Sequence, residues 1–174
     1  CCPARAAFHS GLYPPQSGIW NNVCNEQALS RGLKENVKLW SEDLRETGYE
    51  LHWLGKWHVS AEENPADRGW NEIQASAVKG THHGPQWDNY REAEEMHTRE
   101  QRNEGEIIRP GWKPYRLYGT NDQGNRHDIG ITEKAADILP ELKKAGSPWA
   151  LFAGATGPHD PYFVPSSYID MYDP

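Results

Sequence analysis

The stretch GYELHWLGKWH, residues 48–58, decides the fold class. Large apolar side chains alternate with polar ones over residues 49–54, which is the period-two pattern of a β-strand. The pattern runs directly into the tetrapeptide GKWH, so Lys56 is expected just beyond the end of the strand. The stretch therefore predicts a strand followed at once by a loop that carries a lysine.

A helix is predicted before this strand. Val37, Trp40 and Leu44 recur at helical spacing over residues 37–47, and Gly48 supplies a stop. Helix and strand thus follow one another closely along the chain.

A short helix is also predicted over residues 2–10. Pro3 suits the first helical position, alanines follow it, and Gly11 supplies a stop. Cys1 would then lie at the N-terminus of this helix.

The C-terminal part repeats the helix–strand order. Thr132 is expected to cap an amphipathic helix that Pro140 kinks. Residues 149–155, WALFAGA, form a short apolar run bounded by turn residues, which indicates a strand buried on both faces. This run leads into the turn PHDP, residues 158–161, so His159 is also expected beyond a strand end.

Alternating helices and strands predict an α/β domain with a largely parallel sheet. In such sheets, ligands bind outside the carboxyl ends of the strands, where Lys56, His58 and His159 would fall. Residues 60–127 show no sustained period and are expected to be loop and insertion, apart from a solvated polar helix near residues 90–102.

The composition excludes several classes of protein. The chain of 174 residues has 18 Lys and Arg against 25 Asp and Glu, without basic clusters, which argues against nucleic-acid binding. Eight Trp and eight Tyr supply enough buried area to argue against disorder. Three cysteines, two of them adjacent, give neither a disulfide framework nor a convincing structural zinc site. No membrane-spanning run and no targeting signal is seen.

Four short motifs resemble those of one enzyme family. Residues 1–5, CCPAR, followed by HSGLYP at 9–14, resemble the CxPxR and TGxYP-like signature of the formylglycine-dependent (type I) sulfatases, in the alkaline phosphatase superfamily. GKWH at 55–58 resembles the second signature of that family, and PHDP at 158–161 resembles its later PHxP motif. The motifs occur in the order of the family.

The resemblance implies a modified cysteine. The spacing selects Cys1, and not Cys2, for oxidation to formylglycine by a formylglycine-generating enzyme. One hydroxyl of the hydrated aldehyde would attack sulfur and displace the alcohol, and the other would re-form the carbonyl and expel sulfate from the covalent sulfo-enzyme. The alternative is that Cys1 is an ordinary buried thiol.

The resemblance also implies roles for four further residues. Arg5 would hold the oxygens of the nucleophile, and Lys56 would bind a sulfate oxygen and face the charge on the leaving oxygen. His58 would take a proton from the second hydroxyl. His159 would contact sulfate and protonate the leaving alcohol. The alternatives are, in the same order, a surface arginine near a helix end, a solvated loop lysine, a structural histidine and a rigid turn without function.

The resemblance implies calcium, or a similar divalent cation, as the cofactor. Cys1, as formylglycine, would be one ligand, and the other ligands would lie outside residues 1–174. These residues are therefore expected to be a single partial catalytic domain, an internal fragment with little activity alone. The resemblance implies an exported or lysosomal protein, although the residues leave the compartment open.

The expected function is hydrolysis of a sulfate ester of a small molecule or glycan, on an alkaline-phosphatase-like α/β sandwich. The alternatives are a formylglycine-dependent phosphodiester or phosphonate monoester hydrolase, and a noncatalytic carbohydrate-binding fragment. Polar loop residues that could line a cleft or bind a metal, but more simply face solvent, are His82, His83, His127 and Asp128. Aromatic residues that could stack on sugars, but more simply form core, are Trp87, Trp112, Tyr115 and Tyr118.

Overall fold

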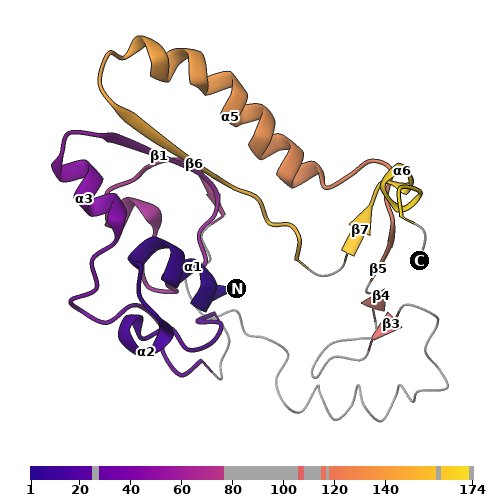
Figure 1. Cartoon of the computed structure of the whole chain (residues 1–174), viewed down its shortest axis with the longest axis horizontal. Coiled ribbons are helices and arrows are strands. Elements are labelled where there is room, and N and C mark those ends of the chain that lie inside the picture. The colour runs from indigo at the N-terminus through magenta and orange to yellow at the C-terminus, as the bar shows by residue number, and fades with distance from the viewer. Residues whose placement is uncertain (25–27, 77–105, 108–114, 117, 160–161, 173–174) are drawn as a thin grey trace. The chain divides into compact units, whose positions relative to one another are not determined.

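The structure is a computed structural model, and it divides into two compact units that are described separately (Figure 1). The first unit comprises Cys1–His82 and Gly130–Ala155, and the second comprises His83–Ile129 and Thr156–Pro174. All residues are described here except 25–27, 77–105, 108–114, 117, 160–161 and 173–174.

A three-stranded parallel sheet lies at the centre of the first unit. Strand β1 (Glu50–Lys56) lies between β2 (Asn71–Ser76) and β6 (Trp149–Gly154) and pairs in parallel with both. The carboxyl ends of the three strands therefore meet at one edge of the sheet. The predicted α/β fold with a parallel sheet is confirmed.

The helices before β1 follow the sequence pattern with one correction. Helix α1 (Cys2–Ser10) has the predicted bounds, with Pro in its first turn and a left-handed Gly11 as its C-cap. Helix α3 (Trp40–Glu46) begins later than predicted, because Leu39 is extended and its N–H is capped by the Glu42 carboxylate at 2.8 Å. The remaining short helices of this unit are α2 (Pro14–Ser17) and the 3₁₀ helix η1 (Pro65–Arg68).

The core of the first unit packs on both faces of β1. One cluster joins α1, β1 and the segments around α3 and Trp57, and it includes the fully buried Leu51 and Trp53 of β1. Leu54 is buried outside this cluster, as are Ile131 and Leu142 of α5 (Arg126–Lys144). Figure 1 accordingly draws α5 on one side of β1 and β6, and α1 and α3 on the other.

Helix α5 begins at Arg126, well before the predicted cap at Thr132. The side-chain oxygen of Asn125 accepts hydrogen bonds from the backbone N–H groups of His127 and Asp128, at 3.1 and 3.4 Å. Asn125 is therefore the residue that starts the helix. The helix continues through Pro140.

Two strand predictions are corrected. Strand β6 was expected to be buried on both faces, but most of its side chains are half-buried, and within the described residues it pairs with β1 alone. Strand β2 falls in the region expected to be loop, and its parallel pairing with β1 shifts register between Trp53 and Leu54.

The second unit contains short elements. Strands β3 (Glu106–Ile107) and β4 (Tyr115–Arg116) are antiparallel, whereas β5 (Tyr118–Thr120) and β7 (Tyr162–Val164) are parallel, and helix α6 is Ser166–Ile169. The polar helix expected near residues 90–102 lies outside the described residues. Within the described part of the chain, no helix combines the length and the apolar character needed to cross a bilayer.

Candidate functional site

Cys1 and His58 come together at the start of α1. Cys1 is exposed, directly precedes the helix, and has its Sγ atom 3.3 Å from Nδ1 of His58. His58 has a left-handed backbone with φ of 56°, which is unusual for a residue with a side chain. The loop after β1 thus places an imidazole against the predicted nucleophile position.

Arg5 joins α1 to the sheet edge. Its Nη1 donates to the carbonyl oxygen of Lys56 at 2.7 Å, and its Nη2 donates to the carbonyl oxygen of Ala155 at 3.2 Å. One planar guanidinium therefore spans the ends of β1 and β6. Burial lowers the pKa of Arg5.

Lys56 is the last residue of β1 rather than the first residue beyond it, and it is only 8 % exposed. Its positive charge acts on the thiols of Cys2 and Cys24. Burial nevertheless dominates and raises the pKa of both thiols. Of the three cysteines, Cys1 alone is exposed.

Gly55 allows this edge to form. Its φ is 91°, and a Cβ at this position would overlap the carbonyl oxygen of Gly154 on the neighbouring strand. Only glycine combines the left-handed backbone with this close approach. The glycine of the GKWH motif is thus required by the geometry of the sheet.

His159 lies in the second unit. It is exposed and follows a cis peptide bond between Gly157 and Pro158. It shares with His127 a pocket of about 530 Å³. The other residues that line this pocket are Asn121, Gln123, Gly124, Asn125, Arg126, Thr156, Gly157 and Phe163.

The structure therefore groups four of the five predicted catalytic residues, Cys1, Arg5, Lys56 and His58, in the first unit. Several further candidates lie outside the part of the chain that the structure describes: His82, His83, Trp87 and Trp112, and the side chains of Tyr115 and Tyr118.

No group of three or more His, Cys, Asp or Glu side chains, among the residues described, could hold a metal ion. The described residues therefore do not fit a complete calcium site, and calcium remains a prediction of the resemblance.

The structure gives two residues surroundings that the sequence patterns did not predict. The Asp128 carboxylate accepts hydrogen bonds from the backbone N–H groups of Thr156 and Gly157, at 2.6 and 2.8 Å. His9 is fully buried, and both of its ring nitrogens lack a hydrogen-bond partner among the described residues. Recognising Asn125 as a helix cap would have placed Asp128 in the first turn of α5.

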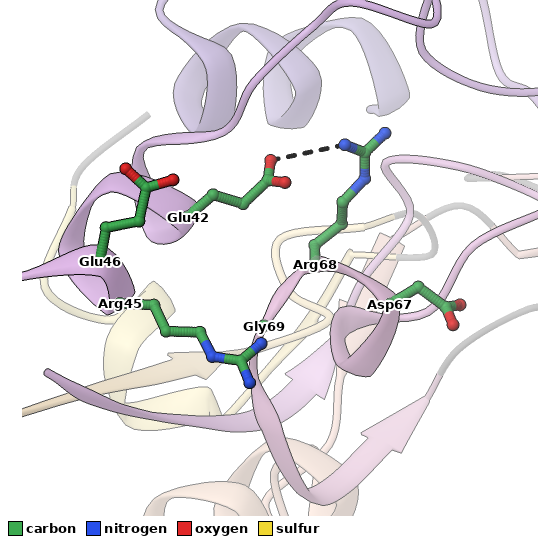
Figure 2. Close-up of a pocket in the computed structure, with 6 residues that line it drawn as sticks. All are labelled: Glu42, Arg45, Glu46, Asp67, Arg68 and Gly69. Carbon is green, nitrogen blue, oxygen red and sulfur yellow. Dashed lines mark hydrogen bonds and ion pairs between the residues drawn. The ribbon is translucent and has the colours of Figure 1, made fainter. Parts of the chain in front are cut away.

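A second pocket, of about 430 Å³, lies between α3 and η1 in the first unit (Figure 2). Arg68 is ion-paired there with Glu42 at 3.4 Å and also with Glu63 at 2.8 Å. None of the predicted site residues lines this pocket. It is lined by Glu42, Arg45, Glu46, Asp67, Arg68 and Gly69.

Comparison with known proteins identifies sulfatases. The chain is 25 % identical over 179 residues to the uncharacterized sulfatase YidJ of Escherichia coli (strain K12), which covers 99 % of this chain and 31 % of YidJ. It is 24 % identical over 191 residues to the choline-sulfatase of Rhizobium meliloti (strain 1021), covering 99 % of this chain and 32 % of that protein. The chain thus spans about a third of the length of these curated relatives.

The fold has a counterpart among solved structures. The crystal structure of Ps i-CgsB superposes with a TM-score of 0.54 at 20 % identity, covering 91 % of this chain and 35 % of that one. This likeness agrees with the alkaline-phosphatase-like α/β fold expected from the motifs. The sulfatase family model matches residues 1–173, so the chain belongs to the sulfatase family.

Proposed function

We propose that the protein hydrolyses sulfate esters through a formylglycine made from Cys1. The observation that carries this proposal is the 3.3 Å approach of His58 Nδ1 to Cys1 Sγ, because a hydroxyl of the hydrated aldehyde would take the place of Sγ and so lie next to the imidazole. The exposure of Cys1, in contrast to the burial of Cys2 and Cys24, supports the choice of cysteine. Modification would require a formylglycine-generating enzyme as partner.

The hydrated aldehyde supplies two hydroxyls on one carbon, one to take the sulfate and one to release it. His58 acts as the base at the releasing hydroxyl, from which it removes the proton. Lys56 supplies a positive charge to the sulfate oxygens, and its low exposure strengthens that interaction. Arg5 fixes the helix that carries position 1 against the ends of two strands.

His159 donates a proton to the leaving alcohol in this proposal. Its pocket offers an amide (Gln123), a cation (Arg126), a second imidazole (His127) and an aromatic ring (Phe163). These groups suit a hydroxyl-rich alcohol such as a sugar, because the ring can stack and the polar groups can bond hydroxyls or a further sulfate. A sulfated glycan is therefore the proposed substrate class. Ps i-CgsB, which shares the fold, has been solved in complex with k-i-k-neocarrahexaose.

The test uses the full-length protein, co-expressed with a formylglycine-generating enzyme. Peptide mass spectrometry should find the aldehyde at Cys1, and purified protein should hydrolyse 4-nitrophenyl sulfate. Cys1→Ala should abolish turnover, whereas Cys2→Ala should retain it. An active protein with an unmodified Cys1 contradicts the proposal.

Two further measurements separate the alternatives. Faster turnover of bis(4-nitrophenyl) phosphate than of the aryl sulfate would identify a phosphodiesterase, because the two esters share a leaving group. Glycan binding without turnover of either ester would identify a binding module.

A further inference from the structure

The half-buried Asp128, in the first turn of α5, makes an unusual set of contacts. Its Oδ1 accepts the backbone N–H of Thr156 at 2.6 Å, and its Oδ2 accepts that of Gly157 at 2.8 Å. Oδ2 also accepts Nδ2 of Asn125 at 3.1 Å. Both carboxylate oxygens thus accept hydrogen bonds from the backbone segment that follows β6.

These hydrogen bonds restrain a short segment. Thr156 and Gly157 are consecutive, so one rigid carboxylate that binds both N–H groups fixes the orientation of the peptide plane between them. The bonds are charge-assisted, which makes them stronger than bonds between neutral groups. Gly157 packs so closely that a Cβ there would lie 3.0 Å from Asp128 Oδ2.

The restrained segment leads directly to His159. Only Pro158, whose ring restricts φ, separates Gly157 from the histidine. Thr156, Gly157 and His159 line the same pocket, so the orientation of the segment also sets where the imidazole enters that pocket. Asp128 itself does not line it.

We propose that Asp128 is a positioning residue for His159: it holds the turn from which the imidazole protonates the leaving alcohol. This inference rests on the proposed function. It assigns to Asp128 a role in the first chemical step, exerted through the backbone without contact to the substrate.

Loss of a positioning residue should change the same kinetic quantity as loss of the residue that it positions. For His159, this quantity is the dependence of kcat on the leaving group. A general acid matters most when the departing alkoxide is basic. Asp128→Ala should therefore reduce kcat for a sulfated monosaccharide roughly 10²-fold, within the range for general acid catalysis, and change turnover of 4-nitrophenyl sulfate only slightly. Asp128→Asn keeps one acceptor oxygen, so its kcat for the sulfated monosaccharide should lie between those of wild type and Asp128→Ala.

The experiment is a double-mutant cycle of Asp128→Ala and His159→Ala on both esters. We expect the double variant to be no slower on the monosaccharide sulfate than His159→Ala alone, because Asp128 then has nothing left to position. Asp137→Ala, which removes an exposed acid from the same helix, is the matched control and should behave as wild type. Amide hydrogen exchange should show faster exchange at Thr156 and Gly157 in Asp128→Ala and in Asp128→Asn.

Two results overturn the inference alone, provided that His159→Ala shows the expected leaving-group dependence. One is equal slowing of both esters by Asp128→Ala, and the other is unchanged exchange at Thr156 and Gly157. If the wild-type protein hydrolyses neither ester, the proposed function fails and this inference fails with it.

Discussion

His58 Nδ1 lies 3.3 Å from Cys1 Sγ, although 57 positions separate the two residues in the sequence. The contact depends on the left-handed backbone of His58, which directs the chain after β1. Unfavourable backbone geometry of this kind persists where the surrounding structure holds it, and it often accompanies function.

Replacing His58 should slow the release of sulfate. In His58→Asn the base is lost, but asparagine tolerates the left-handed conformation, so the loop should keep its course. We expect kcat to fall roughly 10²- to 10⁴-fold, while the first equivalent of alcohol still appears in a burst. Rapid-quench kinetics with 4-nitrophenyl sulfate measures both. Unchanged steady-state turnover would remove His58 from the mechanism.

Arg5→Lys should destabilise the first unit despite keeping the charge. A lysine ammonium cannot span the Lys56 and Ala155 carbonyls as the planar guanidinium does, so one carbonyl loses its partner. We expect the free energy of unfolding to fall by about 1–3 kcal/mol in chemical denaturation. Arg45→Lys, at an exposed position, is the control and should change it by less than about 0.5 kcal/mol. Equal effects of the two variants would contradict the bridging role.

Gly55→Ala and Gly48→Ala form a matched pair. Both glycines have φ of 91°, but a Cβ at Gly48 meets open space, whereas one at Gly55 overlaps the Gly154 carbonyl. Gly48→Ala should lower the free energy of unfolding by about 1–2 kcal/mol, because alanine disfavours the left-handed backbone conformation. Gly55→Ala should cost several kcal/mol more or abolish folding, because β1 and β6 must separate. Thermal melts of both variants test this, and similar melting temperatures would show that the strands can move apart cheaply.

His9 should make stability depend on pH. Burial, reinforced by the charge of Arg5, lowers the pKa of His9 to about 4. Because the unfolded histidine titrates near 6.5, the unfolded state binds more protons between pH 6.5 and 4, and the free energy of unfolding falls as the pH falls through that window. The loss is on the order of 3 kcal/mol at most. It should be complete near pH 4 and absent above about pH 7.

His9→Leu provides the control for that pH dependence. The ring lies among Phe8, Trp40, Trp53 and Phe152, with centroid distances of 5.0, 5.7, 5.3 and 5.1 Å, so an apolar replacement suits the site. Denaturation curves between pH 4 and 8 should show a smaller acid loss for His9→Leu than for wild type. Parallel curves would mean that His9 is not the responsible group.

Local signals in the sequence predicted some elements well. Pro3 and Gly11 mark the ends of α1 in the structure, since both act through their own backbone conformation. The alternation after Gly48 likewise predicted β1, although the strand continues to Lys56. The catalytic assignments came from motif resemblance, and the structure adds the proximity of Cys1 to His58.

Other features depend on partners distant in the chain. The strand pattern of β2, NEIQAS, is too polar to be evident, and it becomes a strand by pairing with β1. His9 looks like a polar residue of a short helix, and its burial requires Trp53 and Phe152 from two different strands. A helix start at Thr132 predicts a solvent-exposed loop position for Asp128, whereas the structure places it in the first turn of α5.

The bond from Arg5 to Ala155 joins residues 150 positions apart. Because ribosomes add about 5–20 residues per second, the segment with Cys1 is made on the order of 10 seconds before Ala155. During that interval α1 has no completed sheet edge on which to dock. The proposed modification of Cys1 therefore has time to take place before α1 docks, while the chain is still being synthesised.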